Sequence, residues 1–560
     1  MSDYVTTLTI YGGIAAVFAI VIFAIYNLLS TRKDIVSKLA SQDGYDSEGQ
    51  YVRDTLLTKP REIGLSIFVN DDAKSIGLRY IVTSILFFFI GGAFGLTMRL
   101  SLTGPNLTFL SSDEYNVLIS QHAVLMIYMW AVGSALGFGY YLLPSHIKVI
   151  RDIRGVLSSA GYWLWLIGGF IVLLAQSSPR WYFYPPLSLQ LNQNGGGLYD
   201  WLSVIGIETV LIGLMITSIT ILLIVIYDRS PEVKRENFSL FTWSIIFTAI
   251  MIIVSAPPLI AGFGMLFYDF FNPIFFTASS GSVLLFAILF WFWGHPVVYI
   301  AIIPYFGLIY EILPKFTGGK IFSYRSGVYG LGLLLILSEV VWGHHLFNSG
   351  LGFAWVLFFS TTSFLVVIPS AITVFNYIAT LWSADKIRMT TPMLFVINGI
   401  VDFIIGGVVG VMQSSYAVNA DVHGTYFVTG HFHFIFLGIT TGVSFAAFYM
   451  LFPTISGGRT YNVLLARLHF YFTAVGSLIM SSSWIVGGAL GMPRATAGYF
   501  AFFLPYQLGS IVGGFIVGIG QIFFLWNIAA SWLKSPSVDN RNMLETPSPI
   551  AMPSGAGELQ

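Results

Sequence analysis

Long apolar runs alternate with short polar connections over most of the 560 residues of the chain. A helix needs about 20 residues to cross the ~30 Å hydrocarbon core of a bilayer. The pattern therefore predicts an all-α polytopic membrane bundle of about 13 transmembrane helices, with expected bounds 5–31, 76–102, 116–143, 155–176, 200–227, 238–264, 276–313, 326–348, 353–383, 391–416, 427–453, 463–488 and 502–533.

Two polar segments outside these runs divide the chain. The first run follows a leader without positive charge and is followed by Arg32 and Lys33, so we expect it to remain as an anchor and not to be a cleaved signal. The tail is rich in Pro and Ser, a composition typical of disorder. We expect an extra N-terminal helix over 1–33, a cytoplasmic linker over 34–75, a twelve-helix core over 76–533 and a disordered cytoplasmic tail over 534–560.

Composition agrees with a chain whose main solvent is lipid. Hydrophobic residues make up 56% of the chain and charged residues 9%, and the mean hydropathy is +0.79. The formal net charge is +0, which gives no reason to expect a nucleic-acid partner. Of the 26 Lys and Arg residues, all except Arg99, Arg180 and Arg494 lie on one set of alternate loops or close to it. The positive-inside rule makes those loops cytoplasmic, with the N-terminus outside and the C-terminus cytoplasmic, in a cell membrane.

The chain has no cysteine and nine histidines. Without cysteine there is no disulfide, iron-sulfur cluster, covalently attached heme or thiolate copper site, so metal chemistry would use imidazole. A lone histidine in a span is often a polar group satisfied by a neighbouring helix, and His146 and His469 fit that interpretation. Six others meet at one depth and indicate a metal site: His122, His295, His344, His345, His431 and His433.

The string TGHFHFIF contains two of these six histidines. Residues two apart on a helix point about 200° away from each other. His431 and His433 therefore cannot share one metal, but each can hold one of two cofactors that flank the helix, and iron porphyrins take such an axial imidazole. If His122 closes the second axial position of one porphyrin, that iron serves electron transfer only, while the other keeps an open face.

Three histidines remain, His295 in WGHPVVYI and the pair His344 and His345 in WGHHLF. Three neutral imidazoles with an open position suit copper or zinc, and the ligand set alone does not choose between them. Tyr299 lies four residues after His295, on the same helix face. It is either a packing residue or a donor of a proton and an electron beside the metal.

At this point the motifs resemble subunit I of the heme-copper terminal oxidases, over about residues 74 to 533. The segments KSIGLRY, MRLSLTGPN, SQHAVLMIY, WGHPVVYI, WGHHLF, HGTYFVTGHFHF and GMPR stand in that family's order. The resemblance implies two hemes, of heme A type, and one copper ion. It implies that His122 and His433 bind the low-spin heme, His431 the high-spin heme, and His295, His344 and His345 the copper. Tyr299 would be the redox-active tyrosine, covalently joined to the copper-ligand histidine one turn before it.

Departures from the resemblance concern proton uptake. Val297 stands where proton-pumping mitochondrial-like members have a glutamate, and the loop PSHIKVIRDIR lacks their channel Asn and Asp residues. We therefore expect that second channel to be absent. Instead, the hydroxyl residues resemble the single proton path of B-type oxidases of thermophilic bacteria and archaea, although Tyr305 lies one position away from the matching site, which is Phe306. The path residues are Tyr310, Thr373, Ser370 and Ser323; alternatively, their hydroxyls only satisfy backbone carbonyls.

Charged residues on the outer side match the places where heme propionates need partners. Arg494 in GMPRAT and Arg99 are expected propionate contacts, although Ala495 replaces a second arginine usual in the family. His423 matches a metal-associated position above the hemes, with Gly424 where many members have aspartate. Glu339 and Asp402 are carboxylates inside predicted spans and are functional candidates without an assigned step.

The function predicted is a respiratory terminal oxidase that reduces dioxygen to water with cytoplasmic protons and so contributes to a proton gradient. The electron donor is quinol, as in B-type archaeal relatives, or alternatively a cytochrome or copper protein. A second oxidase subunit, further small subunits and membrane lipid are the other expected partners. Two rival functions are a nitric oxide reductase, which shares the six histidines but uses non-heme iron, and a transporter without cofactors. Tyr299 and the absence of glutamate at position 297 favour the oxidase.

Overall fold

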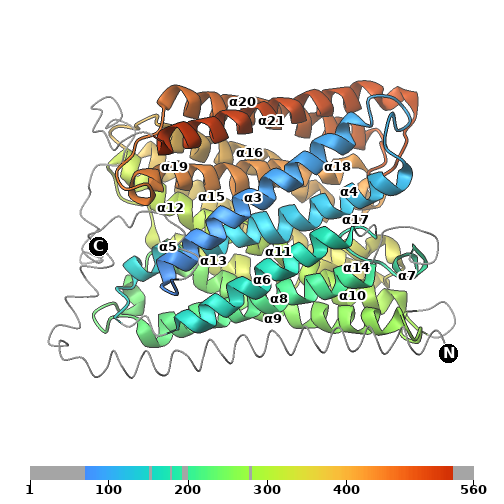
Figure 1. Cartoon of the computed structure of the whole chain (residues 1–560), viewed down its shortest axis with the longest axis horizontal. Helices are drawn as coiled ribbons and strands as arrows, with labels where there is room; N and C mark the ends of the chain where they lie inside the picture. Colours follow the sequence, from blue (N-terminus) through green and yellow to red (C-terminus); the bar gives the residue numbers. More distant parts are fainter. Residues whose placement is uncertain (1–69, 151–153, 177–178, 192–199, 277–280, 534–560) are drawn as a thin grey trace.

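The computed structural model describes residues 70–150, 154–176, 179–191, 200–276 and 281–533 (Figure 1). Within these ranges, 12 helical stretches are long and apolar enough to cross a membrane. The twelve-helix core predicted from the hydrophobic pattern is confirmed, whereas the N-terminal helix expected at 5–31 lies outside the described residues. The spans are Ala73–Leu100, Ser112–His146, Gly155–Ala175, Asp200–Asp228, Leu240–Asp269, Val283–Thr317, Tyr324–Ser349, Phe353–Trp382, Thr391–Ser414, Tyr426–Ile455, Val463–Ala489 and Ala501–Trp532.

Several spans consist of more than one helical segment. The first half of the described chain contains α3 (Ala73–Leu100), α4 (Ser112–Val124), η2 (Leu125–Val132), α5 (Gly133–His146), α6 (Gly155–Ala175), α7 (Leu187–Leu191), α8 (Asp200–Leu223), η3 (Ile224–Asp228), η4 (Arg235–Asn237), α9 (Leu240–Asp269), α10 (Val283–Gly294), α11 (Pro296–Ile300) and α12 (Ile303–Thr317). The second half contains α13 (Tyr324–Ser338), η5 (Trp342–Ser349), α14 (Phe353–Leu365), α15 (Val367–Trp382), α16 (Thr391–Ser414), α17 (Tyr416–Val422), α18 (Tyr426–Ile435), η6 (Phe436–Gly442), α19 (Val443–Ile455), α20 (Val463–Ala489), η7 (Ala501–Phe503) and α21 (Leu504–Trp532).

The span predicted as one continuous helix over 276–313 is broken twice. Helix α10 ends at Gly294, the short α11 begins at Pro296, and α12 begins at Ile303 with Pro304 in its first turn. Proline has no backbone N–H and cannot continue the hydrogen-bond ladder, so it is accommodated in the first turn of a new helix. The breaks place His295 at a helix junction in the middle of the membrane. Irregular backbone at this depth is tolerated only where protein or water satisfies it, and Thr440 donates to the Ala301 carbonyl, at 2.8 Å.

Glycines bring neighbouring spans into close contact. A Cβ added at Gly168 on α6 would lie 2.6 Å from the Gly206 carbonyl oxygen on α8, and one at Gly476 on α20 would lie 2.6 Å from that of Gly513 on α21. Small residues allow membrane helices to approach because van der Waals packing, and not hydrophobicity, drives their association. Figure 1 shows α20 and α21 side by side along one edge of the bundle, with α6, α8 and α9 along the opposite edge.

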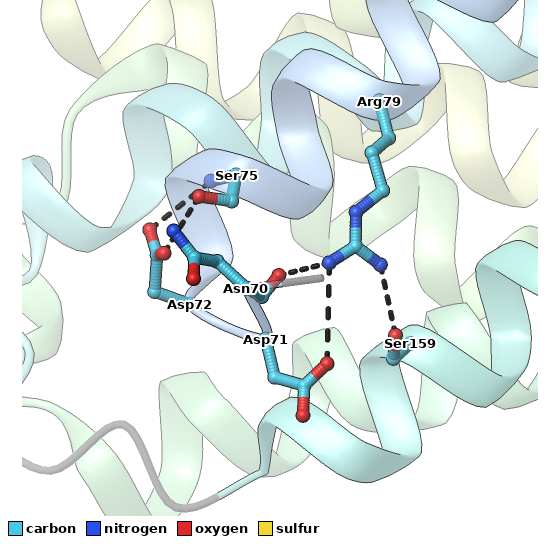
Figure 2. Close-up of polar contacts among 6 residues, drawn as sticks. All are labelled: Asn70, Asp71, Asp72, Ser75, Arg79 and Ser159. Atoms are coloured by element: carbon cyan, nitrogen blue, oxygen red, sulfur yellow. Dashed lines mark hydrogen bonds and ion pairs between the residues drawn. The ribbon is translucent and has the colours of Figure 1, made fainter. Parts of the chain in front are cut away.

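A buried arginine ties the start of α3 to α6 (Figure 2). Arg79 is 0% exposed. Its guanidinium donates to the Asn70 carbonyl and to the Ser159 hydroxyl, the latter at 2.9 Å, and lies 3.9 Å from the Asp71 carboxylate. Asp72 caps the helix by accepting from the Ser75 amide at 3.1 Å. These contacts hold the first turns of α3 against α6.

Candidate metal centre

Three of the predicted ligands form one cluster. His295 lies at the junction of α10 and α11, while His344 and His345 lie in η5, the tightly wound 3₁₀ end of the span that starts with α13. One ligand nitrogen from each of the three lies within 4.8 Å of the others. The ring centroid of His344 is 4.5 Å from that of His295 and 4.4 Å from that of His345. The tertiary fold thus brings together two segments that are 50 residues apart.

Neighbouring side chains orient these imidazoles. The Nδ1 of His295 and the Nε2 of His345 are 3.1 Å apart, so these two atoms point into the cluster. The Nδ1 of His344 is 2.8 Å from the Ser363 hydroxyl on α14, which leaves its Nε2 for a metal. The ring of His345 stacks on Trp291 at 3.7 Å. A hydrogen bond on one ring nitrogen sets the tautomer that ligates through the other.

The cluster fits a copper ion held by imidazole. All three ligands are neutral donors, and no Asp, Glu or Cys belongs to the group among the described residues. The remaining nitrogen of His295, Nε2, is buried without a hydrogen-bond partner. The ring centroid of Tyr299, one turn further along the helix, is 5.0 Å from that of His295. The predicted pairing of this tyrosine with a copper-ligand histidine is therefore sterically possible on the Nε2 side.

The three histidines expected at the hemes share one hydrogen-bond pattern. In each, Nδ1 contacts a backbone carbonyl oxygen: Gly91 at 2.7 Å for His122, Gly406 at 2.8 Å for His431 and Thr429 at 2.8 Å for His433. Because Nδ1 donates its proton to the carbonyl, the Nε2 lone pair is free to bind iron.

The two histidines on α18 face different helices. His431 points towards α16, where a Cβ at Gly410 would lie 2.7 Å from its ring. His433 packs against Trp484 on α20, with ring centroids 4.6 Å apart. His433 lies close enough to His122 for an electrostatic interaction, and His431 lies close enough to His295. The two histidines of α18 therefore have different histidine neighbours.

The surroundings of His122 and His433 are consistent with a bound planar cofactor. A Cβ at Gly95 on α3 would lie 3.0 Å from the His122 ring, so the glycine makes room for it. One face of α20 carries Ser477, Ser481 and Trp484, whose polar side-chain atoms are buried without hydrogen-bond partners. Buried polar atoms are normally paired. Orphaned atoms on the helix that packs against His433 are consistent with a porphyrin and its associated water.

Arginines form a layer close to these histidines. Arg99 is buried over the Tyr426 ring at 5.2 Å and donates to Gln507 at 3.3 Å. The Arg494 amide donates to the Gly424 carbonyl at 3.0 Å. Arg180, to which the sequence assigned no role, donates to the Ala495 carbonyl at 2.6 Å and so joins the same layer.

His423 lies close to Arg494 in the same layer. Its Nδ1 is 3.2 Å from the Asn419 side-chain oxygen. Burial, together with the Arg494 guanidinium, lowers the pKa of His423 to about 4. The imidazole is therefore neutral at pH 7 and can accept a hydrogen bond.

The predicted proton-path residues are only partly brought together. Asn376 on α15, which the sequence analysis did not single out, donates to the Tyr310 hydroxyl at 3.1 Å and to the Ser323 carbonyl at 2.8 Å. The Thr373 hydroxyl, three residues earlier, donates to the Pro369 carbonyl at 2.9 Å. No side-chain hydrogen bond joins Ser370 to the group in the described part of the chain.

Tyr305 has a different environment from the path residues. Its hydroxyl is 2.7 Å from the Ser134 hydroxyl and donates to the Ala131 carbonyl at 2.9 Å, on the other side of α12. It therefore does not replace the hydroxyl missing at Phe306. Two other histidines have structural contacts: His146 lies 3.7 Å from Glu311, and His469 contacts the Tyr449 hydroxyl at 3.0 Å.

The sequence analysis missed three residues that contact the predicted site residues. Ser363, Trp291 and Asn376 contact His344, His345 and Tyr310, respectively. No sequence spacing relates these three residues to their partners. Asn376 alone had a local signal, since an amide in an otherwise apolar run needs a polar partner.

Comparison with known proteins identifies the family of this chain. Residues 75–516 match the family model described as cytochrome C and quinol oxidase polypeptide I. Cytochrome c oxidase subunit 1 of Synechocystis is 34% identical over 475 residues, covering 83% of this chain and 84% of that protein. Cytochrome c oxidase polypeptide 1 of Halobacterium salinarum is 32% identical over 547 residues, covering 95% of this chain and 89% of that protein.

A solved structure shares the fold. The cryo-electron microscopy structure of a heme-copper terminal oxidase dimer aligns with a TM-score of 0.72 at 24% identity, covering 85% of this chain and 86% of that chain. The chain therefore belongs to the heme-copper oxidase subunit I family, the catalytic subunits of terminal oxidases, which bind two hemes and a copper ion and reduce dioxygen.

Proposed function

We propose specific roles for the residues of this chain in dioxygen reduction. His122 and His433 bind the low-spin heme, His431 binds the high-spin heme, and His295, His344 and His345 bind copper. The observation that carries this assignment is the three-histidine cluster, with ligand atoms within 4.8 Å of one another and in electrostatic contact with His431. The bound hemes and copper supply electron transfer and a two-metal site for dioxygen.

Tyr299 is the proposed donor of a proton and an electron for cleavage of the O–O bond. Its ring lies 5.0 Å from His295, beside the copper site. His295 keeps a buried, unpartnered Nε2, which supports the covalent link to Tyr299 that the family resemblance implies. Val297 is fully buried and has no proton to give, so the tyrosine is the acidic group on this stretch of helix.

Protons reach Tyr299 by a single path, as in B-type archaeal members of the family. Tyr299 lies 11 residues before Tyr310, which corresponds to about 16 Å of helix, so relay groups are needed. Tyr310, Ser323, Ser370 and Thr373 supply hydroxyls, and the hydrogen bond of Asn376 to Tyr310 supports a polar route at the lower end. Water completes the gaps between these groups.

Heme-copper oxidase subunit I works with an electron donor and a second subunit, and we propose quinol as the donor here. The hemes are of heme A type. The asymmetric distribution of Lys and Arg supports an orientation with the histidine end outside and the path entrance in the cytoplasm. Arg99, Arg494 and His423 bind the heme propionates at that outer end, and Arg180 adds a cation to the same layer.

The purified complex tests these roles. A reduced-minus-oxidised optical spectrum should show two distinct hemes, and metal analysis should give two irons and one copper for each chain. Iron without copper would instead indicate a nitric oxide reductase, and absent heme bands would indicate a transporter. Oxygen consumption with a quinol and with a reduced soluble cytochrome, measured in parallel, identifies the donor; faster turnover with the cytochrome would contradict the quinol assignment.

A further inference from the structure

Asp402 is a buried carboxylate that the proposed roles do not use. It lies on α16 inside a membrane span and is 5% exposed. No ion pair involves it among the described residues. Within the same ranges, its side-chain hydrogen-bond partner is the amide of Asn398, one helical turn earlier, which donates to Oδ2 at 2.8 Å. A carboxylate at this depth without a cation is unusual and marks a functional position by default.

The face of α16 that carries Asp402 also supports the His431 ligand. Residues 402, 406 and 410 are four apart and share one face of the helix. A Cβ at Gly410 would lie 2.7 Å from the His431 ring, and the Gly406 carbonyl contacts His431 Nδ1 at 2.8 Å. Asp402 thus lies one turn, about 6 Å of helix rise, from the carbonyl that orients the high-spin heme ligand.

A glycine on the adjoining helix leaves room for the Asp402 carboxylate. Gly438 lies in η6, the π-helical continuation of α18, five residues after His433. A Cβ at Gly438 would lie 2.4 Å from the Asp402 Cβ and 2.9 Å from its Oδ2. Any larger residue would displace the acid. The π-helical form is itself uncommon and is enriched at functional sites.

The protonation state of such a group responds to nearby charge. An ionised carboxylate in the membrane interior costs several kcal/mol when no cation compensates it, and one amide donor offsets only part of that cost. The protonated acid avoids the cost. When the positive charge of the adjacent metal site falls by one electron, the balance moves towards the protonated form.

We propose that Asp402 is a redox-linked proton site on the proximal side of the high-spin heme. It binds one proton from solvent as that site gains one electron from the donor, and it releases the proton when the electron passes to dioxygen. The coupling is reciprocal, so protonation of Asp402 also favours reduction of the site. The inference rests on the proposed role of His431 as the ligand, and Asp402 acts through charge without touching the reacting atoms.

Titratable groups on the elements packed against α16 offer no competing partner. None of them forms a hydrogen bond or ion pair with Asp402 in the described part of the chain. They are Tyr305, Tyr310, Glu311 and Lys315 on α12, Tyr377 on α15, Tyr416 and Asp421 on α17, Tyr426, His431 and His433 on α18, Tyr449 on α19, and Arg467, His469 and Tyr471 on α20.

Redox-difference infrared spectroscopy of the purified complex tests the proposal. Reduction should produce the carbonyl stretching band of a newly protonated carboxylic acid, and Asp402→Asn should abolish it. The matched control is Glu339→Gln, since Glu339 also lies in a span and both of its carboxylate oxygens are buried without hydrogen-bond partners. The band should survive in this control. A band that persists in Asp402→Asn, or one that disappears in Glu339→Gln, overturns the proposal.

Potentiometry gives a second readout that a structural role would not move. The midpoint potential of the high-spin heme should depend on pH more weakly in Asp402→Asn than in the wild type, because up to one proton fewer is bound for each electron. The midpoint potential of the low-spin heme should keep its pH dependence. An unchanged pH dependence of the high-spin heme contradicts the inference.

Two further variants guard against misfolding and against a wrong ligand assignment. If Asp402→Asn fails to assemble, Asn398→Leu removes the amide donor and should leave the acid protonated up to higher pH; no shift of the infrared band with pH would overturn the proposal.

His431→Ala tests the ligand itself. If the high-spin heme is retained in that variant, the proposed function fails; if it is lost and the infrared band still does not depend on Asp402, only this inference fails.

Discussion

Replacing Ser363 by alanine should weaken copper binding without touching a ligand. The Ser363 hydroxyl is 2.8 Å from His344 Nδ1 and itself donates to the Phe359 carbonyl at 2.6 Å, so its free lone pair accepts the imidazole N–H. Loss of such an outer partner typically lowers metal affinity by about 10–100-fold, equivalent to about 1.4–2.8 kcal/mol. The cost of leaving one buried donor unsatisfied, about 1–3 kcal/mol, gives the same range.

Copper retention measures this effect. The purified complex is dialysed against increasing concentrations of a copper chelator, and the copper-to-iron ratio is determined by metal analysis. The chelator concentration that removes half of the copper should fall by about 10–100-fold in Ser363→Ala, with both heme spectra retained. Thr362→Ala is the matched control, because the neighbouring hydroxyl donates to the Phe358 carbonyl at 3.0 Å and contacts no histidine. Equal copper retention in the wild type and Ser363→Ala would refute the argument, and so would equal loss in both variants.

Three other substitutions test the remaining roles. Tyr299→Phe should leave both hemes and copper bound but lower the rate of dioxygen reduction by at least about 100-fold, the scale of a lost proton donor; retained turnover, measured with an oxygen electrode, would refute its role. His433→Ala should remove the low-spin component of the reduced-minus-oxidised spectrum while the copper content stays unchanged, and loss of copper instead would contradict the assignment. Thr373→Val should slow proton uptake, measured with a pH-sensitive dye after rapid mixing with dioxygen, whereas an unchanged rate would indicate that this hydroxyl only caps the Pro369 carbonyl.

The sequence predicted six histidine ligands because an unpaired polar side chain is costly inside a membrane. The structure brings His295, His344 and His345 together, and the assignment of each histidine to a metal stays a prediction. His431 and His433 were expected on opposite faces of one helix from their spacing, and they face α16 and α20 in the structure. Prediction failed for the helix around His295, expected to be continuous over 276–313 but broken at Pro296 and Pro304. A proline can break a membrane helix only where another segment forms hydrogen bonds with the backbone carbonyls that the break leaves unpaired. Here Thr440 donates to the Ala301 carbonyl, and the two residues are 139 positions apart in the sequence.

Hydroxyl positions were the least predictable part of the site. Tyr305 and Tyr310 lie five residues apart on α12, yet the first contacts Ser134 and the second Asn376. Nothing in the local pattern distinguishes them, because both are tyrosines in an apolar run. Which hydroxyl joins the proposed proton path depends on which neighbouring helix each ring meets.

The sequence by itself determined the number of core spans, and it predicted imidazole as the metal ligand and a common depth for six histidines. These properties follow from composition and from the rise of a helix, which are local. The tertiary structure alone decided which ring nitrogen of these imidazoles has a hydrogen-bond partner, that Ser363 and Trp291 contact His344 and His345, and that Asp402 lies beside Gly438. These properties depend on contacts between helices far apart in the chain, where glycine positions and helix breaks set the distance of approach.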